Sequence, residues 1–142
     1  MNYQRLKESI IKHEGKRNIC YRDHLGHLTL GYGHLVKDDD DIDPTVEYSD
    51  DFIMKLLEKD LDIAINDANS IIDEADIPEE AFEILVEMCF QLGKPRVLKF
   101  KKFLYHLNKC EFLESADEMI DSLWYQQTPN RVSALAERMR NV

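Results

Sequence analysis

Apolar residues recur every three or four positions along most of this chain, a spacing that predicts helices. The pattern first covers residues 2–13, and Gly15 supplies a natural stop after it. A longer pattern covers about 50–73 and is preceded by Ser49, a favourable N-cap residue. Its apolar positions are Phe52, Leu56, Leu57, Leu61, Ala64, Ile65, Ala68 and Ile72. We predict one long helix there, which would span about 35 Å.

Further helices are predicted in the second half of the chain. Pro78 favours the start of the first, whose inward positions are Phe82, Leu85, Val86, Cys89 and Phe90. A helix over Leu98–Asn108 would bury Phe100, Phe103, Leu104 and Leu107. A helix over Phe112–Leu123 would bury Leu113, Ala116, Met119, Ile120 and Leu123. Residues 124–131 are predicted as a turn that leads into a last helix, capped by Thr128.

Between the first two helices the pattern changes to short β-like runs. Ile19–Tyr21 has the composition of a strand, Asp23–Gly26 that of a turn, and His27–Leu30 that of a returning strand. Leu35–Val36 is expected to close a small antiparallel sheet. Together these elements predict an α+β fold that is mainly helical, with its only sheet near the N-terminus.

Three polar side chains around this hairpin could carry acid–base chemistry. Glu14 ends the first helix, where the helix dipole favours the protonated carboxyl that a general acid requires. Asp23 lies among polar turn residues and is expected to stay ionised. Thr29 would present a hydroxyl from a strand, which suits the orientation of a water molecule. Taken singly, however, these residues are more typical of a helix cap, a turn and a strand.

Three sequence blocks change this interpretation. The first is HEGKRNICYRDHLGHLTLGYGH at His13–His34. Its pattern is Glu14-Gly15, then Asp23 eight residues after that glycine, then Gly26, and then Thr-Leu-Gly-Tyr-Gly-His at Thr29–His34. The second is CFQLG at Cys89–Gly93, and the third is WYQQTPNR at Trp124–Arg131. In content and order these blocks closely resemble the phage-type (T4-like) lysozymes, glycoside hydrolase family 24. The blocks span most of the chain, so the resemblance is specific.

The resemblance implies a fold and a function. The fold would be a single lysozyme-like domain over residues 1–142, with an N-terminal lobe at about 1–50, a connecting helix at about 50–73 and a helical C-terminal lobe at about 74–142. The function would be that of an endolysin-type muramidase, which hydrolyses the β-1,4 bond between N-acetylmuramic acid and N-acetylglucosamine in bacterial peptidoglycan. This reaction would lyse the host cell wall and needs no metal ion or organic cofactor.

The resemblance also implies roles for individual residues. Glu14 would protonate the glycosidic oxygen, Asp23 would stabilise the transition state or activate water, and Thr29 would help to hold that water. His34 is expected to have a structural role, with Asp60 as its partner. The residues implied to bind substrate are Leu35, Phe90, Gln91 and Arg131, the last of which would approach Glu14. Attack of water from the opposite face of the sugar would invert the anomeric carbon, which needs carboxyls ~6.5–9.5 Å apart, against ~5–5.5 Å for retention.

Other functions of such a fold stay open. One alternative is a catalytically weak peptidoglycan-binding module or a structural module of a virion tail. A regulatory or inhibitor-like protein is another, although loss of Glu14 would be expected there. A transglycosylase could use the acid alone, whereas the presence of both Asp23 and Thr29 favours hydrolysis.

The net charge of −10 is the main departure from the family, many of whose members are basic. It argues against nucleic acid as a partner, because such binding depends on neutralising phosphates. The charge is uneven: Met88–Cys110 contains six basic residues and no acid, so the rest of the chain carries −16. This segment could form a basic face toward an anionic cell wall, or only a solvated helix face.

Cysteine and acidic residues suggest no metal site. Cys20, Cys89 and Cys110 have irregular spacing, and we expect three reduced thiols with Cys89 in the core. The acidic run at 37–44 lacks the Gly and Glu positions that an EF-hand calcium loop requires, so a solvated loop is expected.

The sequence contains no apolar run long enough to span a bilayer, and its first residues lack the apolar core of a secretory signal. We therefore expect synthesis in a host cytoplasm and action as a monomer on the cell wall in the periplasm. A holin-like factor or a virion would then have to deliver the protein.

Overall fold

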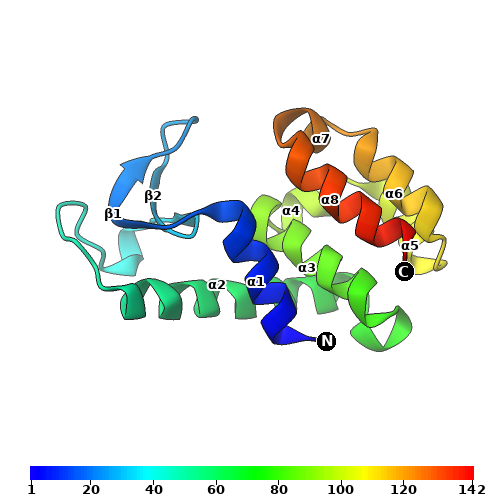
Figure 1. Ribbon diagram of the computed structural model, residues 1–142, viewed down its shortest axis with the longest axis horizontal. Coiled ribbons are helices and arrows are strands. Elements are labelled where there is room, and N and C mark those ends of the chain that lie inside the picture. Colours follow the sequence, from blue (N-terminus) through cyan, green and yellow to red (C-terminus); the bar gives the residue numbers. More distant parts are fainter. The chain divides into compact units, whose positions relative to one another are not determined.

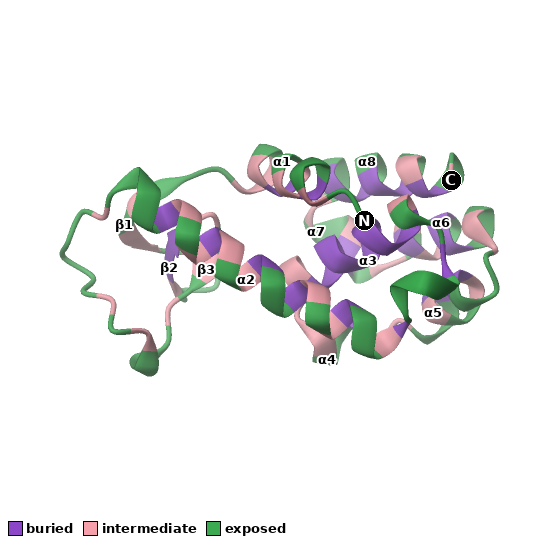
Figure 2. Ribbon diagram, turned by 90° about the horizontal axis from the view of Figure 1, so that it is seen from below, coloured by how far each residue is buried: buried purple, intermediate pink, exposed green.

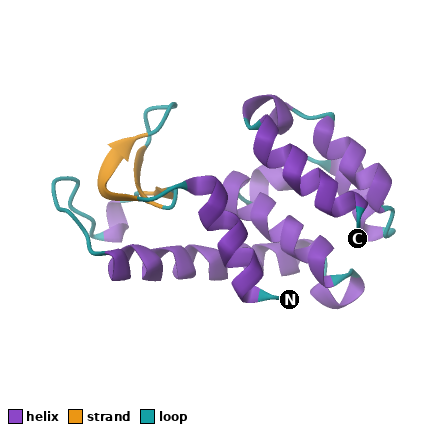
Figure 3. Cartoon of the chain, viewed as in Figure 1, coloured by secondary structure: helices purple, strands orange, loops and turns teal.

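The computed structural model describes all 142 residues and shows a mainly helical chain with one small sheet (Figures 1 and 3). The helices are α1 (Tyr3–Glu14), α2 (Asp50–Ile71), α3 (Glu79–Leu92), α4 (Lys94–Val97), α5 (Lys101–Asn108), α6 (Phe112–Ile120), α7 (Leu123–Gln127) and α8 (Pro129–Arg140). The strands are β1 (Arg17–Arg22), β2 (Leu28–Gly31) and β3 (His34–Leu35). Two short 3-10 turns are η1 (Asp38–Asp40) and η2 (Glu74–Asp76). The predicted α+β class is confirmed.

The chain forms two compact units. One comprises Gln4–Asp62, and the other comprises Met1–Tyr3 together with Ile63–Val142. The boundary therefore falls within α2, and the first three residues belong with the C-terminal unit. The lobe and helix limits expected from the sequence, at about 1–50, 50–73 and 74–142, stay a prediction.

The unit Gln4–Asp62 contains the sheet. Its strands lie in the order β1-β2-β3, and both neighbouring pairs are antiparallel. The buried apolar side chains of this unit are Leu6, Ile10, Leu30, Ile53, Leu57 and Leu61, of which Leu30 lies in β2. A Cβ added at Gly31 would lie 3.0 Å from Cγ2 of Ile53, so the glycine allows β2 to lie close to α2. This packing fixes the sheet against the helices of its own unit.

The helix α2 follows its predicted periodicity with one correction. Its N-cap is Ser49, whose hydroxyl accepts a hydrogen bond from the backbone N–H of Phe52 at 3.1 Å, as predicted. Phe52 was expected to face inward, but its side chain is 38% exposed and stacks on Tyr48. Ile53 is buried instead, because it continues the row of buried positions Leu57, Leu61, Ala64, Ala68 and Ile72.

The C-terminal unit is organised around α3. Every residue from Ala81 to Cys89 is buried, so α3 is enclosed on all sides and not along the single predicted stripe (Figure 2). Around it, α6 packs against α5, α7 and α8, and α8 also packs against α3. A helix enclosed in this way must also bury its polar side chains, and Glu83 and Glu87 are both fully buried.

Two helix boundaries differ from the prediction. Leu98–Asn108 does not form one helix, because Phe100 has a non-helical backbone (φ −78°, ψ 61°) and α5 begins at Lys101. Pro95 lies in the first turn of the short helix α4, where a proline is tolerated. The side chains of Phe103 and Leu107 are buried as expected.

The predicted helix over Phe112–Leu123 ends at Ile120. Ser122 starts α7 by accepting the backbone N–H of Tyr125 with its hydroxyl, so the predicted turn after Leu123 is helical up to Gln127. Leu113 and Leu123 were expected inside, but they are 60% and 63% exposed. The last helix begins as predicted, with Thr128 at the N-cap position and Pro129 next, although the Thr128 hydroxyl is hydrogen-bonded to the carbonyl of Trp124.

The three cysteines are free thiols, and Cys89 is buried as predicted. Burial raises the pKa of the Cys89 thiol to about 12. None of the helices combines the length and the apolar character that a bilayer crossing requires.

Candidate active site

Asp23 lies at the end of β1, where the hairpin turns. Its Oδ1 accepts backbone N–H groups from Leu25 at 2.9 Å and from His27 at 2.8 Å. The hydrogen bond from His27 is the main cause that lowers the pKa of Asp23, and the bond from Leu25 and the nearby imidazoles of His27 and His24 act in the same direction against a burial effect. The expectation that Asp23 stays ionised therefore agrees with the structure.

Thr29 lies in the middle of a row that crosses the sheet. Its Cα pairs with Tyr21 of β1 on one side and with Leu35 of β3 on the other. Directly opposed residues place their side chains on the same face of a sheet. The Thr29 side chain is buried, and its hydroxyl donates to the carbonyl of His27 at 2.9 Å. The two lone pairs of the hydroxyl are thus left to accept hydrogen bonds.

His27 connects the two groups through its backbone. Its N–H binds the Asp23 carboxylate, and its C=O accepts both the Thr29 hydroxyl and the Asp23 N–H. The positions of the carboxylate and the hydroxyl are therefore coupled by one peptide segment. Sequence reasoning placed His27 only as a strand residue, because a backbone contact leaves no signature in residue type.

Glu14 is the last residue of α1, as predicted, and its side chain is half-buried. Its carboxyl group lies against the backbone of Gly33, in the turn between β2 and β3. A Cβ added at Gly33 would be 2.5 Å from Oε2 of Glu14, and Gly33 has a left-handed φ of +79°. Only glycine can occupy this position without moving the carboxyl. The Gly-x-Gly-His turn thus shapes the site of the candidate acid.

Tyr21 is a site residue that the sequence reasoning did not single out. The Arg17 guanidinium lies over its ring, 4.8 Å from the centroid. Burial raises the pKa of the Tyr21 phenol most, the negative charge of Glu14 adds to this, Arg17 opposes it, and the charge of Asp23 raises it again. The phenol therefore lies within electrostatic reach of both carboxyls and opposite Thr29. A residue-by-residue alignment of the two predicted strands could have placed Tyr21 opposite Thr29.

His34 is held between two carboxylates. Its Nδ1 lies 2.6 Å from Asp60 on α2, the predicted partner, and its Nε2 lies 2.8 Å from Asp40 in η1. Burial alone would lower the pKa of His34, but the hydrogen bonds and charges of Asp60 and Asp40 outweigh it and raise the pKa. The histidine thus ties the acidic loop to α2, and the contact with Asp40 was not foreseen.

The remaining predicted substrate residues lie in the C-terminal unit. Phe90 is half-buried near the end of α3. The side chain of Gln91 accepts the indole N–H of Trp124 at 2.9 Å and lies 3.4 Å from the Thr128 hydroxyl, so it joins α3 to α7 and α8. Arg131, in the first turn of α8, is only 7% exposed. Their roles toward substrate, and the approach of Arg131 to Glu14, stay predictions.

Leu35 is 47% exposed and also lines a cavity of about 740 Å³ in the N-terminal unit. The cavity is bordered by Arg22, Leu28 and Val36, which alternate along their strands with Tyr21, Thr29 and Leu35. Because neighbouring strand residues point to opposite faces, this cavity lies mainly behind the sheet and not on the face of Thr29. His27, which binds Asp23 and Thr29 through its backbone, and Leu35, which pairs with Thr29, also line the cavity.

The arrangement contains the parts of an acid–base site on one unit. An ionised carboxylate and a fixed hydroxyl belong to one hairpin, and a second carboxyl lies at a helix end against Gly33. The structure contains no group of three or more His, Cys, Asp or Glu side chains arranged to hold a metal ion.

Comparison with known proteins agrees with this arrangement. A family model described as phage lysozyme matches residues 11–141. The chain is 30% identical to a protein of Dictyostelium discoideum named probable T4-type lysozyme 1, over 89% of this chain and 88% of the relative. It is 29% identical to probable T4-type lysozyme 2 of the same organism, with the same coverage of both chains.

Proposed function

The chain belongs to the phage lysozyme family and is a glycoside hydrolase of the lysozyme type, and we propose that it hydrolyses the β-1,4 bond between N-acetylmuramic acid and N-acetylglucosamine in bacterial peptidoglycan. The observation that carries this proposal is the hairpin of Asp23 and Thr29. One residue, His27, holds the Asp23 carboxylate ionised and directs the Thr29 hydroxyl. An ionised carboxylate and a hydroxyl in a fixed orientation are the groups that activation of water at a sugar carbon requires.

The proposed reaction assigns a separate task to each side chain. Glu14 donates a proton to the glycosidic oxygen as the bond to the leaving sugar breaks. Asp23 stabilises the positive charge that develops on the sugar ring, or accepts a proton from the attacking water. Thr29 accepts a hydrogen bond from that water, because its own proton is donated to the His27 carbonyl. Attack by a water held in this way predicts inversion at the anomeric carbon.

Substrate contacts are proposed for Leu35, Phe90, Gln91 and Arg131. Leu35 shares the sheet face of Thr29 and is exposed enough to touch a sugar ring. Phe90 offers an aromatic edge, and Gln91 is fixed by Trp124, so it is a rigid polar group. Arg131 supplies a cation that can neutralise a carboxylate of the substrate or of the site.

We further propose that the protein is an endolysin-type enzyme that lyses a bacterial cell wall. It would act as a monomer on glycan strands in the periplasm, after synthesis in a host cytoplasm and delivery by a holin-like factor or a virion. The two relatives come from Dictyostelium discoideum and not from a phage, so this cellular setting is independent of the proposed chemistry.

A catalytically weak peptidoglycan-binding or virion-tail module is the second candidate. The net charge of −10 favours it, because a strongly acidic enzyme would be repelled by an anionic wall. The intact Glu14, Asp23 and Thr29 set favours hydrolysis.

Product analysis tests the proposal. Purified peptidoglycan is digested, the new ends are reduced with borohydride, and the fragments are identified by mass spectrometry. A muramidase produces reduced N-acetylmuramic acid ends. Reduced N-acetylglucosamine ends would indicate cleavage of the other glycosidic bond, and anhydro ends would indicate a transglycosylase. Binding without any new ends would support the second candidate.

A further inference from the structure

The lysines and the arginine from Lys94 to Lys109 form no ion pair with any acid. Elsewhere in the chain, several cations have an acidic partner, as in the pairs of Lys7 with Glu58, Lys16 with Asp50 and Arg140 with Asp117. The six cations of this segment, none of which has such a pair, are Lys94, Arg96, Lys99, Lys101, Lys102 and Lys109. In a chain with 28 acids and 18 lysines and arginines, this segment is unusual because it contains six of those 18 cations and no acid.

Three of these lysines surround an exposed tyrosine on α5. Residues three or four positions apart share a helix face, which places Lys101, Lys102 and Lys109 around Tyr105. The Tyr105 side chain is 55% exposed, and the Lys109 ammonium lies 4.6 Å from its ring centroid. The opposite side of α5 is fixed in the core by buried residues, which are Phe103 and Leu107. We refer to Lys101, Lys102, Tyr105 and Lys109 as the α5 face.

A shallow hollow of about 390 Å³ continues the α5 face toward α7. Lys99, Phe100 and the exposed Leu123 line it, together with Lys101 and Lys102. Two acids, Glu118 and Asp121, also border it. The hollow therefore combines apolar surface with charges of both signs, while the α5 face itself carries only positive charge.

We propose that the α5 face binds the stem-peptide carboxylates of peptidoglycan and thereby anchors this acidic enzyme to its substrate. The proposal rests on the proposed function, because it assumes that peptidoglycan is the substrate. Each stem peptide carries free carboxylates, which are suitable partners for unpaired lysines. The Tyr105 ring supplies a flat apolar surface that can pack against a sugar or a peptide backbone.

Charge explains why such an anchor would be needed. The protein carries −10 in total, so its average field repels an anionic wall. A local surface of unpaired lysines reverses the sign of that field within about one Debye length, ~10 Å at 0.1 M salt. Nucleic acid is a less suitable partner, because phosphate binding depends on many cations and the remaining surface is acidic.

A sedimentation experiment with Gram-negative sacculi tests the proposal, since such sacculi lack wall phosphate polymers. Both test proteins carry Glu14→Gln, so that the substrate is not digested. One replaces Lys101, Lys102 and Lys109 of the α5 face by Gln. The matched control makes the same change of three charges at Lys12, Lys55 and Lys59, which are exposed in the N-terminal unit.

The α5 variant should bind sacculi about tenfold more weakly than the control at low salt, as expected for three exposed charge contacts. The difference should vanish at 1 M salt, and also on sacculi whose stem peptides have been removed by an amidase. Equal binding by the two variants would overturn the proposal. An equal loss of binding to duplex DNA would overturn it as well, because the face would then be a general polyanion surface.

The same variants with Glu14 restored separate this proposal from the proposed function. On peptide-free glycan strands, the α5 variant should release reducing ends at the wild-type rate. If the wild type itself released none, the proposed function would fail whatever the binding result. If hydrolysis occurred and binding were insensitive to the lysines, only the anchor would be excluded.

Discussion

The two units differ in how far they bury the carboxyl groups of four acids. In the C-terminal unit, Glu83 and Glu87 are fully buried on α3. In the N-terminal unit, Glu14 and Asp23 are only partly buried, at the edges of the sheet. All four are acids within or next to regular elements, yet one pair belongs to the core and the other to the candidate active site.

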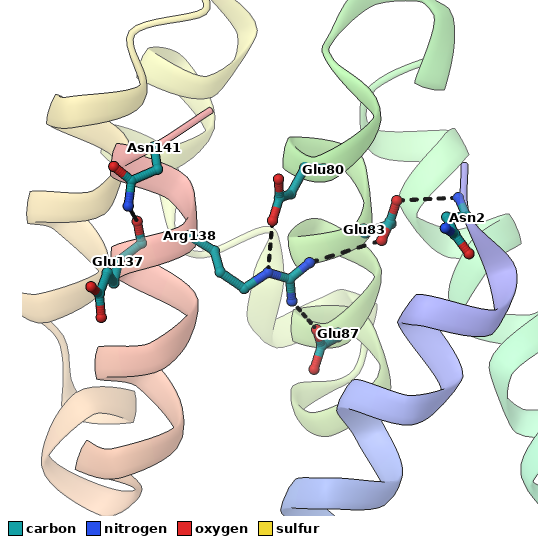
Figure 4. A network of polar contacts seen from close by, with 7 residues as sticks. All are labelled: Asn2, Glu80, Glu83, Glu87, Glu137, Arg138 and Asn141. Carbon is teal, nitrogen blue, oxygen red and sulfur yellow. Dashed lines mark hydrogen bonds and ion pairs between the residues drawn. The ribbon is translucent and has the colours of Figure 1, made fainter.

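The buried pair belongs to a cluster of polar contacts around Arg138 (Figure 4). The Arg138 guanidinium lies 3.1 Å from Glu87, 3.8 Å from Glu83 and 3.0 Å from Glu80. The backbone N–H of Asn2 adds a hydrogen bond to Glu83 at 3.2 Å. A buried carboxylate is tolerated only with such partners, because its desolvation is costly.

The candidate catalytic pair contacts the backbone of its own unit. Asp23 accepts two main-chain N–H groups, and Glu14 lies against the bare Cα of Gly33. The hydrogen bonds to Asp23 come from uncharged main-chain groups, which fix the position of the carboxylate. The buried glutamates thus contact a cation, whereas the hydrogen bonds to Asp23 come from main-chain N–H groups.

Removal of Arg138 should have the largest effect on stability. Arg138→Met keeps most of the side-chain volume but removes a cation that contacts the buried Glu83 and Glu87, so we expect a loss of about 3–5 kcal/mol. Urea unfolding followed by circular dichroism measures it. Arg140→Met is the matched control, since it breaks the exposed pair with Asp117 and should cost about 0–1 kcal/mol. Similar losses in the two variants would contradict the role given to burial.

Displacement of the Glu14 carboxyl should have the next largest effect, which is a loss of activity. Gly33→Ala would place a methyl group 2.5 Å from Oε2 of Glu14, and a displacement of about 1 Å can reduce the rate about 100-fold. Gly15→Ala is the control, because Gly15 also has a left-handed φ (+67°) but has open space around the added Cβ. Initial rates of peptidoglycan hydrolysis, corrected for folded fraction, distinguish the two. Equal rates would show that Gly33 does not position Glu14.

Replacement of His34 should reduce stability in a pH-dependent way. Because the folded pKa of His34 is raised, its contribution is fully present below its ordinary value near 6.5 and is lost as pH rises through the raised pKa. His34→Gln should therefore cost about 2 kcal/mol at pH 5.5 and less at pH 9. Thermal unfolding at both pH values tests this.

At low pH, protonation of Asp40 limits the stability that the ion pair between His34 and Asp40 contributes. The pKa of Asp40 is lowered, chiefly because the Lys37 N–H and His34 outweigh its burial, so its stabilising effect is lost as pH falls through that lowered value. His106→Gln is the control, since His106 pairs with the more exposed Glu111 and should matter less at every pH. An equal, pH-independent loss of stability in both histidine variants would argue against a stabilising role of the His34 ion pairs.

The smallest expected effect is that of the Tyr21 hydroxyl. Tyr21→Phe keeps the ring under Arg17 but removes the O–H near both carboxyls, and a loss of one hydrogen-bonding dipole should lower kcat about fivefold. The pKa of Tyr21 is raised, so the phenol stays protonated in the assay range and the acidic side of the pH profile should not change shape. Tyr125→Phe, in the other unit, should leave kcat unaltered. An unchanged kcat for Tyr21→Phe would remove it from the site.

Local chemistry made much of the N-terminal unit predictable. Gly15 ends α1 because its φ is left-handed, and the Asp23–Gly26 turn forms because Asp23 caps its own following N–H groups. Such interactions join residues within a few positions, so residue type and spacing are sufficient to find them. The positions of Glu14, Asp23 and Thr29 followed from the same signals together with the family resemblance.

Long-range contacts were not predictable in this way. Periodicity treats a glutamate as outward-facing, so it could not indicate that Glu83 and Glu87 meet Arg138, which is more than fifty residues away in sequence. It also assigned Leu113 and Leu123 to the core, because it cannot know which helix faces find a neighbour. Asp40 was one of several similar acids, and only the fold brings it to His34.

The central claim is that Glu14 is the acid of a peptidoglycan hydrolase. The most direct test compares wild type with Glu14→Gln for the clearing of outer-membrane-permeabilised Gram-negative cells and for the release of reducing ends. With both proteins equally folded, we expect the variant to lose about 100- to 10,000-fold of the wild-type rate. Equal rates for the two proteins, or no release by either, would contradict the account.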